Sequence, residues 1–269
     1  MAAIHLIPDA ARLQESVQLA QEFGACFEYN DFFAPALLDD GQRLRERVAL
    51  YKAADRDRSL DTLHGAFFDV TVHSDDSRIR QVSELRVRQS MDVARELGVR
   101  GVVFHTGIIP NFKSPFYRDN WVERNDRFWT GICEEYPQIE VYIENMFDTD
   151  PACLAALAKR MQAVSSFGVC LDYAHAQVFG NDPQPWVEQL GPYVKHMHIN
   201  DNDGLDDLHG AVGSGVTDWA RFNKLLAEQG IRPSVLIEVK DLDAQRRSLE
   251  FMRDASIYPY DVERGGTTC

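Results

Sequence analysis

The chain has 269 residues and a mass of 30.6 kDa, which suits one large domain better than two ordinary domains joined by a linker. Its composition, with 45% hydrophobic and 26% charged residues, 17 glycines and 11 prolines, excludes a fibrous or disordered protein. The formal net charge of -14 argues against a polyanion such as nucleic acid as the main partner, because nucleic-acid affinity depends on Lys and Arg.

No segment of the sequence indicates export or a membrane. Residues 1–8 lack a basic segment followed by a long apolar run, so no signal peptide is predicted, and no apolar run approaches the roughly 18 residues of a membrane span. The five cysteines are odd in number and scattered without a Cys-x-x-Cys pair, which argues against a disulfide framework or a thiolate zinc site. We therefore expect a cytoplasmic protein, and the sequence leaves open whether it forms a homo-oligomer.

Short apolar runs alternate with longer segments of helical periodicity along the whole chain. This alternation is typical of repeated βα units. The predicted strands are residues 3–7, 25–29, 62–67, 101–105, 140–145, 168–172, 194–199 and 234–239. Helical patterns lie near residues 9–20, 75–97, 120–135, 151–164, 185–190, 218–229 and 242–253. The mixed-charge run around Arg43, Arg45 and Arg47 indicates a solvated helix face.

Eight strand and helix pairs in about 250 residues match the size of a closed (β/α)8 barrel, a TIM barrel of the α/β class. We predict a single barrel domain over residues 1–254, followed by a C-terminal tail over residues 255–269 that has little apolar pattern. An open, doubly wound sheet is the alternative fold. It is disfavoured because no predicted strand leads into a Gly-x-Gly-x-x-Gly turn.

Residues able to bind metals gather at the C-terminal ends of the predicted strands, where barrel enzymes place their chemistry. Carboxylates meeting in one barrel mouth repel one another unless they are protonated or bind cations, and imidazoles at the same rim make a metal the simplest compensator. Mixed histidine and carboxylate ligands without thiolate suit Zn2+, Mn2+ or Fe2+ better than Ca2+ or Mg2+. The candidates are Glu144, Asp172, Asp207 and Glu238, together with His64, His105, His175, His198 and His209.

Other polar residues near the strand ends receive separate predictions. Glu28 ends a strand and is a candidate either for contact with the substrate or for support of the ligands. Lys113 and Lys240 follow the fourth and eighth strands and are candidates for contacting a substrate phosphate, although lysines more often face solvent. His196 points the same way as His198 but lies one layer deeper, so it is assigned to packing.

This constellation resembles the xylose isomerase-like TIM barrel superfamily, which contains AP endonuclease family 2 (endonuclease IV) and the sugar phosphate isomerase/epimerase-like proteins. Residues 170–175, Cys-Leu-Asp-Tyr-Ala-His, are similar to the family's Asp-x-x-His segment, and residues 198–219 carry a histidine, an Asp-x-His and a Gly-x-Gly loop like those of the family. In the endonuclease IV branch, the matching positions imply that all nine candidates bind three zinc ions. In the isomerase and epimerase branch they imply one ion, often manganese, held by Glu144, Asp172, His198 and Glu238.

The resemblance implies, first, a metal-dependent isomerase or epimerase that acts on a sugar or sugar phosphate by proton transfer next to a metal-polarised carbonyl. Glu144 and Glu238 would be the acid and the base, and His175 would orient or protonate the oxygen. The alternative is phosphodiester or phosphomonoester hydrolysis, which would use all nine donors and two or three zinc ions. A non-catalytic metal- or sugar-binding barrel is the third hypothesis. We expect one to three divalent ions, Zn2+ or Mn2+, per chain.

Two departures from the family patterns bear on the substrate. Asn202, Asp203 and Leu208 stand where the nuclease pattern has Lys or Arg beside the ligands, which removes positive charge from the path of a DNA backbone. Gly204 stands near the position of a substrate-binding arginine in the tagatose-epimerase-like pattern. The expected partner is therefore a small sugar or sugar phosphate rather than nucleic acid, and its identity lies outside the sequence.

Overall fold

The computed structural model describes residues 2–261 and contains a closed barrel of parallel strands, β1 to β8, in sequential order. Each strand pairs with the next, and β8 pairs with β1 through Ile4 and Val235, which closes the barrel. The predicted (β/α)8 fold is therefore confirmed. The strands are β1 (Ile4–Leu6), β2 (Cys26–Tyr29), β3 (Thr62–His64), β4 (Gly101–His105), β5 (Glu140–Glu144), β6 (Phe167–Asp172), β7 (Val194–Ile199) and β8 (Ser234–Ile237).

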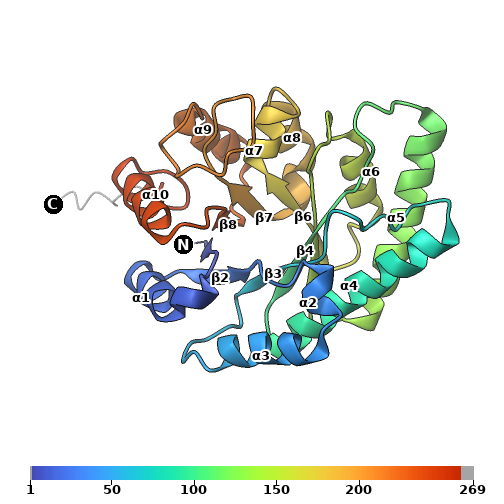
Figure 1. Cartoon of the computed structure of the whole chain (residues 1–269). Helices are drawn as coiled ribbons and strands as arrows, with labels where there is room; N and C mark the ends of the chain where they lie inside the picture. The colour runs from blue at the N-terminus through green and yellow to red at the C-terminus, as the bar shows by residue number, and fades with distance from the viewer. Residues whose placement is uncertain (1, 262–269) are drawn as a thin grey trace.

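Helices alternate with the strands along the chain and surround the barrel (Figure 1). In α1, for example, Leu13, Val17 and Ala20 are buried on one stripe, as the helical period requires. The α-helices are α1 (Leu13–Phe23), α2 (Pro35–Leu38), α3 (Gly41–Lys52), α4 (Ser77–Leu97), α5 (Pro115–Glu135), α6 (Ala152–Arg160), α7 (Tyr173–Val178), α8 (Gln184–Leu190), α9 (Trp219–Gln229) and α10 (Leu242–Asp254), with short 3-10 helices η1 (Ala10–Arg12) and η2 (Gly191–Tyr193). Among residues 2–261, no helix combines the length and the apolar character needed to cross a membrane.

Two strands, β3 and β8, end two or more residues earlier than the sequence pattern predicts. β3 ends at His64 and β8 at Ile237, whereas the predicted strands continue to residues 67 and 239. At β8 the backbone N–H of Glu238 still bonds to the carbonyl of Ile199, but Val239 N–H then bonds back to Ile237, so the chain turns at Glu238. This turn sets the Glu238 carboxylate at the rim of the barrel.

Part of the predicted C-terminal tail packs on the barrel. Tyr258 is fully buried, its hydroxyl donates a hydrogen bond to the carbonyl of Pro233, and its ring lies 6.5 Å from that of Phe222. Residues 262–269 of this predicted tail lie outside the described residues. The four cysteines within the described residues are free thiols.

Candidate metal centre

The nine side chains predicted from the strand ends converge on the barrel mouth, where they form three groups. In the inner group, one ligand atom from each residue lies within 4.8 Å of the others, and the same holds for the side group. In the rim group, Asp207 Oδ2 lies 3.2 Å from His175 Nε2 and 2.9 Å from His209 Nε2. The inner group is Glu144, Asp172, His198 and Glu238; the side group is His64, His105 and Glu144; the rim group is His175, Asp207 and His209.

The pairing of neighbouring strands explains why these side chains meet. The parallel register places His105 beside Glu144 and Asp172 beside His198. Because partners in register point to the same face of a sheet, each pair projects its side chains together into the barrel. His175 follows in the first turn of α7, where its N–H bonds to the Asp172 carboxylate at 2.6 Å. Strand register therefore builds the inner and side groups, and a helix start adds the first residue of the rim group.

Glu144 lies at the centre of the mouth. It is fully buried, its Oε1 lies 3.0 Å from His198 Nδ1, and its Oε2 lies 3.2 Å from His105 Nε2 and 3.5 Å from His64 Nε2. None of these approaches has the geometry of a hydrogen bond, and both carboxylate oxygens lack a hydrogen-bond partner within the described residues. Because its two oxygens face different groups, Glu144 could contribute one oxygen to an ion in each.

Three of the histidines are oriented by the backbone. In each, Nδ1 lies at hydrogen-bonding distance from a carbonyl oxygen to which Nδ1–H can donate, so that the neutral ring would present the Nε2 lone pair to an ion in the mouth. Metal-binding histidines typically use their second nitrogen in this way. The pairs are His64 with Gly65 at 3.1 Å, His175 with Asn145 at 2.8 Å and His209 with Glu238 at 3.0 Å.

The donor set fits divalent cations. Within the described residues, every ion-pair partner of the mouth carboxylates is a histidine, so no Lys or Arg balances their charge. Buried polar atoms without a hydrogen-bond partner are expensive and rare. In this mouth they include both oxygens of Glu144, Asp172 Oδ2, Glu238 Oε2 and His198 Nδ1. Cations in the mouth would satisfy these atoms and balance the carboxylate charge.

Without cations, the mouth residues shift one another's pKa values. Burial, reinforced by Glu238 and opposed by His175, raises the pKa of Asp172 to about 8. Burial opposes protonation of His209, but Asp207 outweighs it and raises the pKa of His209 to about 9. The metal-free mouth thus holds protons that bound cations would displace.

The segment between β7 and α9, which carries Asp207 and His209, is organised by Asp201. Its carboxylate is buried and accepts hydrogen bonds from the N–H groups of Gly213 at 2.8 Å and Thr217 at 3.1 Å, and from Trp219 Nε1 at 3.0 Å. One carboxylate therefore fixes the course of the whole segment.

Local backbone geometry also shapes this segment. A Cβ on Gly215 would collide with the carbonyl oxygen of Asn202, so only glycine fits there. His209 has φ of 47°, a left-handed conformation that is uncommon for residues other than glycine and that clusters at functional sites. The backbone of the segment is therefore strained at His209, the residue that completes the rim group.

The remaining predicted residues do not belong to the three groups. Glu28 is fully buried one layer below, with Oε1 3.2 Å from His198 Nε2, so of its two predicted roles its position suits support of the ligands rather than substrate contact. His196 is fully buried and lies 2.7 Å from Ser234 Oγ. Lys113 and Lys240 are exposed, and within the described residues neither forms an ion pair.

Sequence reasoning gave no role to Asn145 or Asp201. The Asn145 side chain accepts a hydrogen bond from the Asp172 N–H and donates one to the Asp172 carbonyl, both at 2.9 Å, while its own carbonyl faces His175 Nδ1. Through these hydrogen bonds Asn145 continues the pairing of β5 with β6 beyond Glu144, the last residue of β5. Asn145 directly follows β5 and Asp201 lies just after β7, and this position at a strand end is the signal by which the sequence could have identified them.

Comparison with known proteins places the chain among related sequences. A family model described as a xylose isomerase-like TIM barrel matches residues 12–255. Uncharacterized protein MJ1311 of Methanocaldococcus jannaschii is 28% identical over 218 residues, which cover 76% of this chain and 73% of that protein. A probable endonuclease 4 of Mycobacterium leprae is 26% identical over 166 residues, or 55% of this chain and 62% of that protein.

Solved structures share the fold. A D-tagatose 3-epimerase-like protein superposes with a TM-score of 0.72 and 22% identity, over 94% of this chain and 96% of that one. The TTHB071 protein from Thermus thermophilus, soaked with ZnCl2, has a TM-score of 0.67 and 24% identity, over 93% of this chain and 96% of that one. At these identities the likeness establishes the barrel architecture.

Proposed function

We propose that this chain, which belongs to the xylose isomerase-like TIM barrel family, is a metal-dependent enzyme that hydrolyses a phosphoester of a small molecule. The observation that carries this proposal is the position of Glu144, whose Oε1 faces the inner group and whose Oε2 faces the side group. A carboxylate that divides its oxygens in this way suits at least two ions. Hydrolysis also gives a role to all nine donors.

Each group would hold its ion with residues from different elements. The inner group offers three carboxylates and one imidazole, the side group two imidazoles and the shared Glu144, and the rim group two imidazoles and Asp207. Bound divalent ions polarise phosphoryl or carbonyl oxygens and lower the pKa of water, chemistry that serves both phosphoester hydrolysis and proton removal beside a carbonyl. Zn2+ and Mn2+ both suit these nitrogen and oxygen donors.

The mouth itself indicates which phosphoesters fit. Its uncompensated carboxylates would repel a phosphate, so the chain depends on its cations, rather than on Lys or Arg, to bind one. The ring of Phe67 lies 5.1 Å from His64 and 5.0 Å from His105, which gives one side of the mouth an aromatic wall. This combination suits a small organic phosphate, and the net charge of -14 argues against a nucleic-acid backbone.

The second candidate is the isomerase or epimerase activity on a sugar or sugar phosphate that the sequence suggested first. It is favoured by the completeness of the inner group, whose four ligands suffice for one ion. Glu144 and Glu238 both approach His198 Nδ1, at 3.0 Å and 3.4 Å, so two carboxylates lie beside one ion position and can take and return a carbon-bound proton. The likeness in fold to a D-psicose 3-epimerase, with a TM-score of 0.66, is consistent with this candidate.

Metal analysis of the purified protein and of the His209→Ala variant separates the two candidates. Hydrolysis predicts two or three ions per chain, one fewer in the variant, and phosphate release that falls with that loss. The isomerase predicts one ion in both proteins and interconversion of a ketose and an aldose or of epimers. His73→Ala, which removes a histidine outside the three groups, is the control. A wild-type protein that binds no divalent ion would refute both candidates.

A further inference from the structure

A layer of buried polar side chains lies directly beneath the inner group. Barrel interiors are mostly filled by branched apolar residues. Here Glu28 and His196 are fully buried and Thr62 is only 1% exposed. Within the described residues, the ion-pair partners of Glu28 are His196 and His198. A carboxylate held so deep without Lys or Arg needs both a full set of hydrogen bonds and a source of positive charge.

The contacts of Glu28 leave one of its oxygens for His198. Oε2 accepts a hydrogen bond from Thr62 Oγ1 at 2.6 Å and lies 3.1 Å from His196 Nε2. Oε1 lies 3.2 Å from His198 Nε2 without the geometry of a hydrogen bond, and neither of these two buried atoms has a hydrogen-bond partner in the described part of the chain. Thr62 and His196 therefore fix the carboxylate so that Oε1 faces the imidazole.

The opposite nitrogen of the same ring faces the mouth. His198 Nδ1 lies 3.0 Å from Glu144 Oε1 and 3.4 Å from Glu238 Oε2, inside the inner group. An imidazole can give a lone pair to an ion through Nδ1 only when its proton is on Nε2, and a buried Nε2–H needs an acceptor. Glu28 Oε1, 3.2 Å away, is the carboxylate oxygen that faces this nitrogen and could accept from it.

We propose that Glu28 is a positioning residue that holds the Nε2–H of His198 and so directs the Nδ1 lone pair at the inner-group ion. This inference rests on the proposed metal-dependent function, since it concerns the ion that the inner group would hold. The carboxylate fixes the ring's tautomer and raises its basicity, and the ion beyond the ring balances the buried charge of Glu28. A residue that no substrate reaches thereby sets the affinity of the metal centre.

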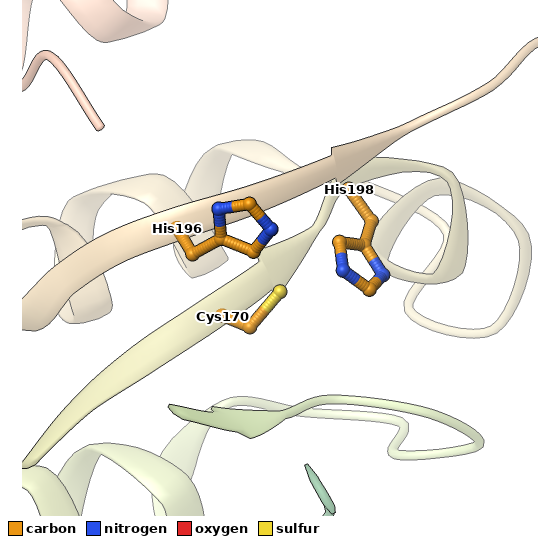
Figure 2. Close-up of side chains that lie close together, drawn as sticks. All are labelled: Cys170, His196 and His198. Atoms are coloured by element: carbon orange, nitrogen blue, oxygen red, sulfur yellow. The ribbon is translucent and has the colours of Figure 1, made fainter. Parts of the chain in front are cut away.

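The thiol of Cys170 offers a competing use of the same histidines. Cys170, His196 and His198 each have a ligand atom within 4.8 Å of the others, and Figure 2 shows the two histidines on one strand beside the cysteine on its neighbour. An ion held by these three would take histidine nitrogens that Glu28 requires. The inference therefore predicts that Cys170→Ala retains every ion of the wild-type protein.

The test compares wild-type protein with Glu28→Gln, which keeps the size and an acceptor oxygen but removes the charge. Binding of Zn2+ alone and of Mn2+ alone is measured by competition with a chelator, and the His198 tautomer by 15N NMR of the imidazole. We expect one ion to bind about 10–100-fold more weakly in the variant, the range typical of lost outer-shell partners, with the other ions unchanged. Glu140→Gln is the control, since Glu140 lies at the other end of β5 and pairs with Arg100 and Lys195.

Thr62→Val gives a milder second variant in case Glu28→Gln fails to fold. It removes one hydrogen bond to Glu28 Oε2, so we expect affinity for the same ion to fall about two- to tenfold. Unchanged affinity and tautomer in both variants, or loss of an ion in Cys170→Ala, would overturn the inference while leaving the proposed function intact. A wild-type protein without ions would overturn both.

Discussion

Replacing Asp201 with asparagine tests whether one buried carboxylate holds the segment between β7 and α9. Oδ1 accepts hydrogen bonds from the N–H groups of Asn202 and Thr217, both at 3.1 Å. Oδ2 accepts from Gly213 N–H at 2.8 Å and Trp219 Nε1 at 3.0 Å. Whichever way the new amide is oriented, its NH2 group faces two donors, so two of these hydrogen bonds are lost.

The expected loss of stability follows from those two bonds. A hydrogen bond to a charged group contributes about 1.5–3 kcal/mol, so the variant should lose about 3–6 kcal/mol of unfolding free energy. That is a large part of the roughly 5–15 kcal/mol typical of whole proteins. Because the segment carries Asp207 and His209, the rim group should also lose its ion while the inner group keeps its own.

Urea denaturation of the metal-free protein, with metal analysis at saturating Zn2+, measures both effects. Asp203→Asn is the matched control, because Asp203 is exposed in the same segment and caps only the N–H groups of Leu205 and Asp206. We expect that control to change the unfolding free energy by less than about 1 kcal/mol. The reasoning is refuted if Asp201→Asn unfolds within about 1 kcal/mol of the control and still binds every ion.

Three further predictions concern other parts of the fold. Burial lowers the pKa of His5 to about 3, so below about pH 6.5 the unfolded chain takes up a proton that the folded chain does not, and the free energy of unfolding falls as the pH falls. In urea denaturation between about pH 4 and 6, His5→Gln should remove about 1.4 kcal/mol per pH unit of this dependence. An unchanged dependence would contradict the lowered pKa of His5. Gly215→Ala should displace the segment past Asn202 and remove one ion per chain, which metal analysis would detect; full ion content would disprove the predicted collision. Tyr258→Ala should lower the unfolding free energy by about 3–5 kcal/mol, because its buried ring and its hydrogen bond are both lost. A urea midpoint equal to that of wild type would show that Tyr258 does not contribute to the stability of the fold.

The barrel was predictable because its information is local. Each strand is a short apolar run followed by a helical pattern, as in β4 and α5, and the pattern is repeated around the closed sheet. The helices α2 and α7, with 4 and 6 residues, escaped prediction because less than two turns carries too few residues to show a helical period. The end of β8 was misplaced because Ile237, Glu238 and Val239 continue the alternating strand pattern through a turn that only the backbone hydrogen bonds of Glu238 and Val239 define.

The sequence predicted which residues form the site but not how their side chains contact one another. Strand ends and alternation predicted that Glu144, Asp172 and His198 would share one mouth, and the structure brings them together. The division of Glu144's oxygens between two groups, and the contact of Glu28 with His198, depend on side-chain rotation and on neighbours far away in sequence. For this reason the sequence ranked the isomerase first, and our proposal of hydrolysis rests on the division of the Glu144 oxygens that only the structure reveals.

The division of ligands between strands and one segment has an evolutionary consequence. Glu144 stands on β5, inside the barrel wall, so any exchange there disturbs two groups and the core packing together. Asp207 and His209 stand on the segment between β7 and α9, outside the strands, and connecting segments vary more among related proteins than the strands they connect. If the rim group holds an ion, as proposed, a lineage with this barrel could gain or shed that ion by exchanging one surface segment while inheriting the inner group unchanged.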